Sequence, residues 1–292
     1  MQILTSTAEL REVLALQRLG GRSIGLVPTM GNLHSGHLKL VDSAVKQCDF
    51  VVSTIFVNPL QFGPNEDLEA YPRSLRDDQE KLISAACSCL FVPAEEELFG
   101  PERKDTTIIS VPEMSEIYCG KSRPGHFDGV ATIVCKLFNI VQPDKAFFGY
   151  KDYQQLLLIR RMTQDLSFDI EIVGIETARN ASGLALSSRN SYLDREELAT
   201  AAMLYHCLAS AADAIINGSR DYLKLEKTAT QKLSDAGFVV DYFSICNAEN
   251  LVAASHQDRS LVILAAAILG SCRLIDNVQL QVDVQSIERQ VN

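Results

Sequence analysis

The chain alternates short apolar runs of strand length with segments whose apolar residues recur at helical spacing. The strand-length runs are 24–27, 50–57, 90–92, 145–148 and 170–175, and the helical segments are 38–47, 75–86, 130–141 and 153–163. This alternation is typical of right-handed βαβ units, which build a parallel sheet with helices on both faces. We therefore predict an α/β fold whose N-terminal domain is a doubly wound, Rossmann-like parallel sheet.

The alternation ends after Gly174, and the pattern changes to helices followed by strands. Two helical patterns precede three apolar runs of strand length: 194–216, 222–236, 239–246, 260–269 and 272–280. Successive helices and then successive strands indicate an α+β arrangement with antiparallel pairing. We predict two domains, residues 1–177 and a smaller α+β domain over residues 178–292.

The segment from Pro28 to His37 follows a predicted strand and leads into a predicted helix. In a parallel sheet this junction lies beyond the carboxyl ends of the strands, where ligands bind. His34 and His37 are three residues apart, so they would share one face of the first helical turn, beside backbone N–H groups that attract anions. Gly31 and Gly36 would allow a ligand to approach the backbone. The segment predicts a phosphate site, although one or both histidines could instead only cap the helix or pack against it.

Two neutral amides, Asn58 and Gln61, follow the predicted strand over 50–57. An amide can donate to a carboxylate and accept from a hydroxyl, which suits recognition of a small polar molecule. On this segment alone, a turn-forming Asn-Pro pair with a solvated Gln explains the residues better.

Two further segments carry cations. Lys151 at a predicted helix start is unfavourable for the helix dipole, and an anion beside it would explain its presence. Asp152 is suited to capping that helix, and Gln155 would face the same side as Lys151. The run 187–189, Ser-Ser-Arg, predicts a flexible phosphate clamp, with a solvated polar loop as the alternative.

Charge and composition narrow the class of protein. The formal net charge is −10, which argues against a general binder of nucleic acid or membrane surfaces, because both need a basic face. Residues 1–20 lack the pattern of a signal peptide, and the apolar stretch 261–270 is too short to cross a bilayer. We expect a cytoplasmic protein without a membrane or nucleic-acid partner.

The N-terminal residues and the cysteines also carry local predictions. Ser6 to Glu9 predict a capping box that opens an amphipathic helix, whose apolar residues are Leu10, Val13, Leu14 and Leu16. The eight cysteines are scattered, and the spacing of Cys87 and Cys89 matches no common zinc pattern. We expect reduced, mostly buried thiols and no protein metal motif.

Taken together, these segments resemble the pantoate–β-alanine ligase family, the bacterial pantothenate synthetases of the nucleotidyltransferase superfamily. His-x-Gly-His alone marks only the superfamily, whereas the ordered set of motifs is far more specific and covers nearly the whole chain. The matching segments are 27–37, 56–62, 71–73 (Tyr-Pro-Arg), 123–127 (Arg-Pro-Gly-His-Phe), 151–155 (Lys-Asp-Tyr-Gln-Gln) and 184–190 (Leu-Ala-Leu-Ser-Ser-Arg-Asn).

The resemblance implies a ligase that condenses (R)-pantoate with β-alanine at the expense of Mg²⁺-ATP. The pantoate carboxylate would attack the α-phosphorus to give pantoyl adenylate and pyrophosphate. The amine of β-alanine would then attack the activated acyl carbon, which releases AMP and pantothenate. It also implies a homodimer whose partners are small-molecule substrates, with residues 1–177 as the nucleotide-binding catalytic domain.

The resemblance also implies residue roles. His37 would act as proton donor, with His34 and Lys151 as the other catalytic groups. Gln61 would bind pantoate and β-alanine, Gln155 would bind pantoate, and Asn58 would belong to the substrate site. The implied ATP-binding residues are Met30, Gly31, Asn32, Leu33, His34, Ser35, Gly36, His37, Gly149, Tyr150, Lys151, Asp152, Ala178, Leu186, Ser187, Ser188 and Arg189.

Two departures from the family pattern and two other functions stay open at this point. Tyr150 stands where the family usually has Glu, and Asn180 to Gly183 replaces a more usual Asp-Gly approach to the Ser-Ser-Arg run. An adenylyltransferase of the same superfamily would share the histidines but would not need Gln61 and Gln155. A regulatory module that only binds ATP would not need so many donors to a transition state.

Overall fold

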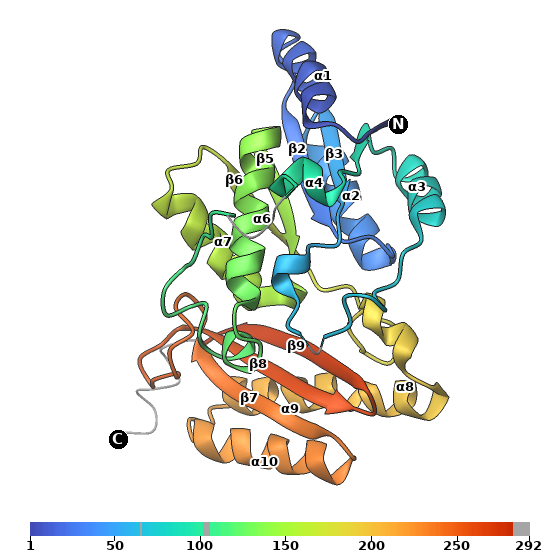
Figure 1. The fold of residues 1–292 in the computed structure, drawn as a ribbon. Coiled ribbons are helices and arrows are strands. Elements are labelled where there is room, and N and C mark those ends of the chain that lie inside the picture. The colour runs from blue at the N-terminus through green and yellow to red at the C-terminus, as the bar shows by residue number, and fades with distance from the viewer. Residues whose placement is uncertain (65, 102–105, 283–292) are drawn as a thin grey trace. The chain divides into compact units, whose positions relative to one another are not determined.

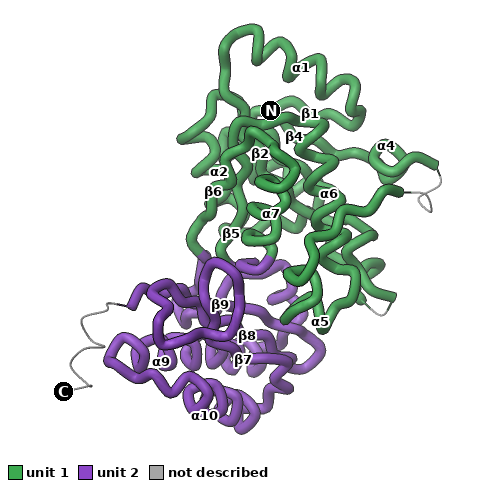
Figure 2. The backbone as a smooth tube through the Cα atoms, turned by 90° about the vertical axis from the view of Figure 1, so that its left-hand side faces the viewer, with its two compact units in different colours: residues 1–150, 155–176 green, residues 151–154, 177–292 purple. Residues whose placement is uncertain are grey.

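The computed structural model describes residues 1–64, 66–101 and 106–282. The chain divides into two compact units (Figure 2). Unit 1 consists of Met1–Tyr150 and Gln155–Glu176, and unit 2 consists of Lys151–Gln154 and Thr177–Asn292.

Unit 1 is built on a six-stranded parallel sheet (Figure 1). Its strands are β1 (Gln2–Leu4), β2 (Ile24–Thr29), β3 (Phe50–Ile55), β4 (Cys89–Phe91), β5 (Lys145–Gly149) and β6 (Glu171–Ile175). The spatial order β1-β4-β3-β2-β5-β6 reverses direction between β2 and β5. This confirms the predicted doubly wound sheet. It also places the topological switch point, where such sheets bind ligands, beside the ends of β2 and β5.

The helices of unit 1 follow the predicted order, with three differences. They are α1 (Thr7–Leu19), α2 (Ser35–Gln47), α3 (Leu75–Ser84), α4 (Glu95–Phe99), α5 (Cys119–Ser122), α6 (His126–Val141) and α7 (Tyr153–Asp165), with the 3₁₀ turn η1 (Pro59–Gln61). The turn η3 (Tyr150–Asp152) and the first two residues of α7 include Lys151–Gln154, which belong to unit 2. Helix α6 begins four residues before the predicted segment, directly after Gly125 in a left-handed conformation. The elements β1, α4 and α5 were not predicted, because these short segments mix apolar with polar residues and show no clear apolar run or period.

The third difference concerns α1. Ser6 caps this helix by accepting a hydrogen bond from the Ala8 N–H, and Leu10 and Leu14 are buried. Leu16 is 67% exposed, so its assignment to the apolar face was wrong. Two residues correspond to about 200° around a helix, which turns Leu16 away from Leu14.

Unit 2 pairs three antiparallel strands with helices on one face (Figure 1). Its elements are η4 (Ser188–Tyr192), α8 (Arg195–Ala201), α9 (Met203–Ile216), α10 (Tyr222–Asp235), β7 (Val239–Asn247), β8 (Ser260–Leu269) and β9 (Cys272–Gln281). This confirms the predicted α+β pattern. The single helix predicted over 194–216 is instead two helices, α8 and α9, with Ala202 between them.

The segment Arg195–Ile216 is long and apolar enough to span a membrane by length and composition. Its second part, α9, buries Leu204, Leu208 and Ile215 in the core of unit 2 and packs against strands β8 and β9. A helix buried in this way is a core helix of unit 2.

Helix α6 and the turn η1 approach each other at Gly129. A Cβ atom at this position would lie 2.3 Å from the Leu60 carbonyl oxygen and 2.6 Å from the Gln61 nitrogen. Only glycine therefore permits this packing, which fixes where the turn after β3 lies.

We expect Gly129→Ala to destabilise the protein by about 1–3 kcal/mol, because the backbone of η1 must move to admit the methyl group. Chemical denaturation followed by circular dichroism measures the change. Gly63→Ala is a matched control in the same segment, since its Cβ would meet nothing closer than the Glu66 side chain at 3.7 Å. A Gly129→Ala variant with the parent's denaturation midpoint would show that α6 does not pack on η1 in this way.

Candidate active site

The two histidines cap helix α2 reciprocally at the end of β2. His34 is the N-cap residue, and its Nδ1 accepts a hydrogen bond from the Gly36 N–H at 3.1 Å. The His34 N–H donates in turn to Nδ1 of His37 at 3.3 Å. The two ring centroids are 4.0 Å apart. The predicted pairing of the rings is confirmed, and so is the alternative that both histidines cap the helix.

This capping determines which nitrogen of each ring carries a proton. Because backbone N–H groups can only donate, Nδ1 of His34 and of His37 must each be an acceptor. A neutral imidazole with an accepting Nδ1 carries its proton on Nε2, and an imidazolium has no acceptor at all. The geometry therefore provides two neighbouring Nε2–H donors, the kind of group that stabilises charge on phosphate oxygens.

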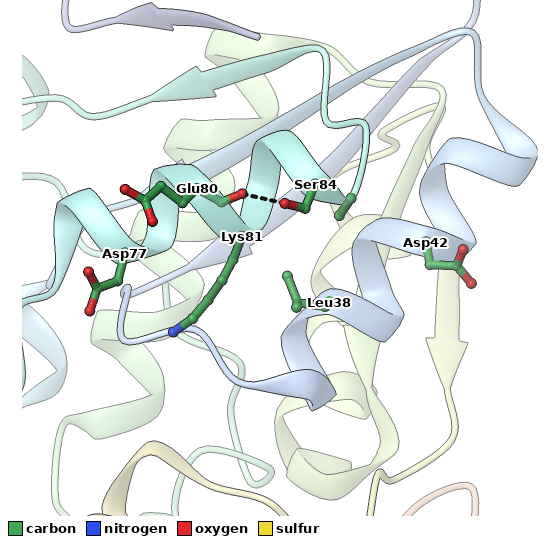
Figure 3. Close-up of a pocket in the computed structure, with 7 residues that line it drawn as sticks. Leu38, Asp42, Asp77, Glu80, Lys81 and Ser84 are labelled. Atoms are coloured by element: carbon green, nitrogen blue, oxygen red, sulfur yellow. Dashed lines mark hydrogen bonds between the residues drawn. The ribbon is translucent and has the colours of Figure 1, made fainter.

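The turn before the histidines is held by helix α3. Gly31 and Asn32 both have positive φ, at 85° and 50°. The buried Asp78 carboxylate accepts from the Asn32 N–H at 2.8 Å and from the Leu33 N–H at 2.7 Å. Lys81, one turn further along α3, donates its ammonium to the Leu33 carbonyl at 2.8 Å, and Figure 3 shows this side chain extending from α3.

These contacts revise the sequence-based picture of the phosphate site. The N–H groups of Asn32, Leu33, His34 and Gly36 all donate to side chains of the protein. The expectation that the backbone of this loop provides the anion donors is therefore wrong for these four groups. The side chains of Asp78 and Lys81 were missed because acidic residues in a first helical turn and exposed lysines are ordinary features of a helix.

A pocket lies between α2 and α3 (Figure 3). Its lining residues are Leu38, Asp42, Asp77, Glu80, Lys81, Ser84 and Ala85. The lining carries three carboxylates and one ammonium, so its net charge is negative. The pocket is therefore unsuited to binding a triphosphate.

Asn58 and Gln61 follow β3, the neighbour of β2 in the sheet. Asn58 is buried, and its Nδ2 donates to Gln61 Oε1 and to the Gly129 carbonyl, both at 3.0 Å. Gln61 Nε2 lies 3.1 Å from the sulfur of Met30, which brings Gln61 to the histidine loop. Since both amide hydrogens of Asn58 are used within the protein, its geometry favours orienting Gln61 over direct contact with a substrate.

Two side chains, Arg123 and His126, hold the backbone carbonyl of Gln61 by hydrogen bonds. Arg123 pairs with Glu66 through two hydrogen bonds and also donates to the Gln61 carbonyl at 3.3 Å. His126 Nε2 lies 3.0 Å from Arg123 Nη1 and must accept, so its Nδ1 donates to the same carbonyl at 2.8 Å. Burial pushes the pKa of Glu66 up, but the hydrogen bonds and charge of Arg123 outweigh it and hold the pKa below its ordinary value.

At the end of β5, the departure at Tyr150 is matched by a glycine in the next strand. A Cβ on Gly174 of β6 would lie 2.6 Å from the Tyr150 ring. The Tyr150 ring therefore packs over Gly174, beside Gly149 at the switch-point edge of the sheet. Gln155 lies in the first turn of α7 and is half-buried.

In unit 2, Lys151 and Asp152 lie side by side, with Nζ and Oδ1 3.7 Å apart. The Lys151 side chain is 18% exposed. Its carbonyl accepts a hydrogen bond from the amide of Asn277 on β9 at 2.9 Å. An ammonium held this far from water strengthens any interaction with an anion.

The Ser-Ser-Arg run, for which we predicted a flexible phosphate clamp or else a solvated polar loop, lies at the start of a capped 3₁₀ turn. Ser187 is the N-cap of η4 and accepts from the Arg189 N–H at 3.3 Å. The Leu186 N–H donates to the Ala178 carbonyl at 2.9 Å, which closes the hairpin before the turn. Ala178, Leu186, Ser187, Ser188 and Arg189 are thus brought together within unit 2, and each is half-buried.

The described residues contain no group of three or more His, Cys, Asp or Glu side chains that could hold a metal ion. A Mg²⁺ ion that takes its ligands from phosphate oxygens and water needs no such group. All eight cysteines lie in the described ranges, seven of them are buried, and none forms a disulfide there.

Comparison with known proteins decides the family. The sequence matches the pantoate-beta-alanine ligase family over residues 2–279. The chain belongs to this family. It is 55% identical over 283 residues to the pantothenate synthetase of Pseudomonas fluorescens strain Pf-5, an alignment that covers 97% of this chain and 99% of that relative. The chain is accordingly an enzyme, a ligase.

Solved structures of the pantoate–β-alanine ligase family share the fold. The pantothenate synthetase of Thermus thermophilus superposes with a TM-score of 0.89 at 42% identity, covering 95% of this chain and 99% of that one. The pantoate-beta-alanine ligase of Francisella tularensis, complexed with beta-gamma ATP and β-alanine, superposes with a TM-score of 0.80 at 32% identity and covers 95% of this chain and 97% of its own.

We expect Asp78→Asn to destabilise the histidine loop by roughly 1–3 kcal/mol. An amide can offer only one accepting atom where the carboxylate accepts from both Asn32 and Leu33. Hydrogen exchange measured on the peptide over 30–37 should become faster. Glu80→Gln, on the exposed face of the same helix, is the control and should leave the exchange unchanged. Equal exchange in Asp78→Asn and the parent would exclude the proposed bracing of this turn.

Proposed function

We propose that the protein condenses (R)-pantoate with β-alanine to form pantothenate, using ATP and releasing AMP and pyrophosphate. The observation that carries this proposal is the near full-length similarity to relatives named pantothenate synthetase. The complex of the Francisella relative with beta-gamma ATP and β-alanine supports ATP and β-alanine as substrates.

The chemistry proceeds in two steps. A pantoate carboxylate oxygen attacks the α-phosphorus of ATP, the bond from that phosphorus to the β-phosphate oxygen breaks, and pyrophosphate leaves with the electron pair. The β-alanine nitrogen then attacks the acyl carbon of pantoyl adenylate. The bond from that carbon to the phosphate oxygen breaks, AMP leaves, and the amine proton passes to solvent. Activation is needed because a free carboxylate is a poor electrophile.

In unit 1 we assign the segment Met30–His37 to ATP. The Nε2–H groups of His34 and His37 would donate to phosphate oxygens as negative charge develops on the pyrophosphate. Gly149 and Tyr150, at the end of β5, would form the edge of the nucleotide site at the switch point. Gln61 would bind pantoate and β-alanine, Gln155 would bind pantoate, and Asn58 would hold the Gln61 amide in place.

In unit 2 we assign Lys151, Asp152, Ala178, Leu186 and the run 187–189 to the nucleotide. Lys151 and Arg189 would offset the charge of the triphosphate, and the hydroxyls of Ser187 and Ser188 would donate to its oxygens. These groups need only bind and align the phosphates, because phosphoryl transfer requires charge stabilisation and alignment rather than a covalent protein group.

Mg²⁺, bound mainly by triphosphate oxygens and water, would neutralise part of the triphosphate charge. From the family resemblance we also propose a cytoplasmic homodimer with small molecules as its only ligands. We further propose residues 1–177 and 178–292 as its two domains.

We expect exchange of pyrophosphate into ATP with pantoate alone, without β-alanine, because adenylation is a separate half-reaction. The measurement uses labelled pyrophosphate, with pantoate and β-alanine each omitted in turn. AMP should accumulate only when all three substrates are present. Exchange that requires β-alanine would contradict a free pantoyl adenylate, and exchange with neither acid would contradict the ligase itself.

We expect Gln61→Ala and Gln155→Ala each to raise the KM for pantoate about 5- to 150-fold, equal to roughly 1–3 kcal/mol. Each truncation leaves polar groups of pantoate without a partner, whereas the affinity for ATP should hardly change. Steady-state kinetics and ATP calorimetry separate the two effects. Gln231→Ala, on the exposed face of α10, is the control. A parent-like KM together with weakened ATP binding would instead favour an adenylyltransferase.

A further inference from the structure

Two adjacent polar residues, Asp276 and Asn277, are buried in the middle of β9. Each is only 4% exposed. Burying a carboxylate and an amide costs free energy unless each has a partner, and apolar side chains would pack such a strand at least as well. Their partners therefore indicate what the two residues do.

Asp276 holds the hairpin that leads to the Ser-Ser-Arg run. Its two carboxylate oxygens accept from Nη1 and Nη2 of Arg179, at 2.5 and 2.9 Å. Arg179 also donates to the Gly183 carbonyl at 3.1 Å, and its guanidinium lies 3.9 Å from the centroid of the Tyr205 ring. Hydrogen bonds from both Nη atoms and the stacking of its face on Tyr205 hold the Arg179 guanidinium in one position. The hairpin that carries Arg179 is therefore held in place as well.

The departure from the family pattern lies within this hairpin. Asn180 Oδ1 accepts from the backbone N–H groups of Ser182 and Leu184, both at 3.0 Å. Gly183 follows with a φ of 90°, and a Cβ there would lie 2.5 Å from the Tyr205 ring. The sequence Asn-Ala-Ser-Gly thus forms a tight turn beneath Tyr205, and Arg179 connects that turn to β9.

Asn277 holds the segment that carries Lys151, the second cationic segment of unit 2. Its Nδ2 donates to the Lys151 carbonyl at 2.9 Å. Its own carbonyl accepts from Arg179 at 3.3 Å, and its N–H donates to Asp276 at 2.8 Å. Burial raises the pKa of Asp276, while Arg179 and the charge of Lys151 oppose that rise. One pair of adjacent residues therefore contacts both the Lys151 segment and the Arg179 hairpin.

We propose that Asp276 and Asn277 are positioning residues for a nucleoside triphosphate. They set the distance between Lys151 and the Ser187–Arg189 turn so that both reach the same chain of phosphates. The inference rests on the proposed function, because it takes these two segments as the ATP-binding groups of unit 2. Neither residue touches the ligand, so their effect is on the geometry of groups that do.

The test compares variants of β9 by ATP calorimetry and by steady-state kinetics on the full-length protein. Asn277→Ala removes the hydrogen bond to Lys151, and Asp276→Asn removes the charge that Arg179 pairs with. We expect each to raise the dissociation constant and the KM for ATP at least 10-fold. The KM for pantoate should stay within about 2-fold of the parent.

Asp241→Asn is the matched control, because it breaks a different ion pair of β9, between Asp241 on β7 and Arg273 on β9. Asp241 accepts from Arg273 at 2.6 Å, and we have placed neither residue at the nucleotide site. A purely structural role for β9 would move the melting temperature of all three variants without the selective loss of ATP affinity. Arg179→Lys should behave like Asp276→Asn, since lysine keeps the charge and loses the two-point contact.

The outcomes separate this inference from the proposed function. A parent enzyme without pantoate-dependent pyrophosphate exchange overturns the proposed function, and the inference falls with it. A parent with normal exchange, whose Asn277→Ala variant binds ATP as tightly as the parent, overturns the positioning role alone. Asn277→Ala removes a neutral amide and no charge, so this comparison holds even if Asp276→Asn does not fold.

Discussion

The backbone N–H groups between β2 and α2 need hydrogen-bond acceptors that neither the sheet nor the helix supplies. Side chains of unit 1 provide these acceptors. Gly31 and Asn32 have left-handed conformations, so the N–H groups that follow point away from the β2 ladder. Asp78 accepts two of them, and the two histidine rings accept the next two. Because the rings use Nδ1 for this purpose, their Nε2–H groups are set by the fold before any ligand arrives.

The same demand explains why a helix-capping role and a chemical role are compatible at His34 and His37. Capping uses one nitrogen of each ring and fixes the other in both proton state and direction. An aspartate at the cap would satisfy the backbone equally well, but its carboxylate has no hydrogen to donate. The pairing of two rings with centroids 4.0 Å apart therefore combines local stability with preorganised donors.

Much of the fold could be predicted from the sequence because most of its elements coincide with apolar runs or with apolar residues at helical spacing. The strands β2 to β6 and the helices α2, α3, α6 and α7 follow apolar patterns that one segment reveals by itself. The errors were local and had physical causes: Leu16 turns to solvent by helix geometry, and Ala202 divides one predicted helix into two. The short elements β1, α4 and α5 mix apolar with polar residues and carry too little pattern to detect, whereas the equally short β4 lies in an apolar run.

The site was less predictable, because what holds it in place comes from distant parts of the chain. Nothing near residue 32 indicates that Asp78 accepts its N–H, and nothing near Tyr150 indicates that Gly174 makes room for its ring. The Ser-Ser-Arg run can be picked out from the sequence as a candidate, but its 3₁₀ turn follows a hairpin held by Asp276. A motif shows which side chains carry chemistry, whereas the tertiary contacts decide how rigidly they are presented.

Burial divides the polar residues of this protein into two groups with different tasks. Asn58, Asp78, Asp276 and Asn277 are all buried to within a few per cent, and each holds the backbone or side chain of a neighbouring segment. Four polar side chains assigned to ligands are half-buried instead: His37, Gln61, Lys151 and Ser187. A fully buried polar group has its partners within the protein, and a group that binds a substrate must keep part of its surface for it. The half-buried residues that face ligands are the ones that a family motif records. The fully buried residues determine whether that motif has the geometry for catalysis.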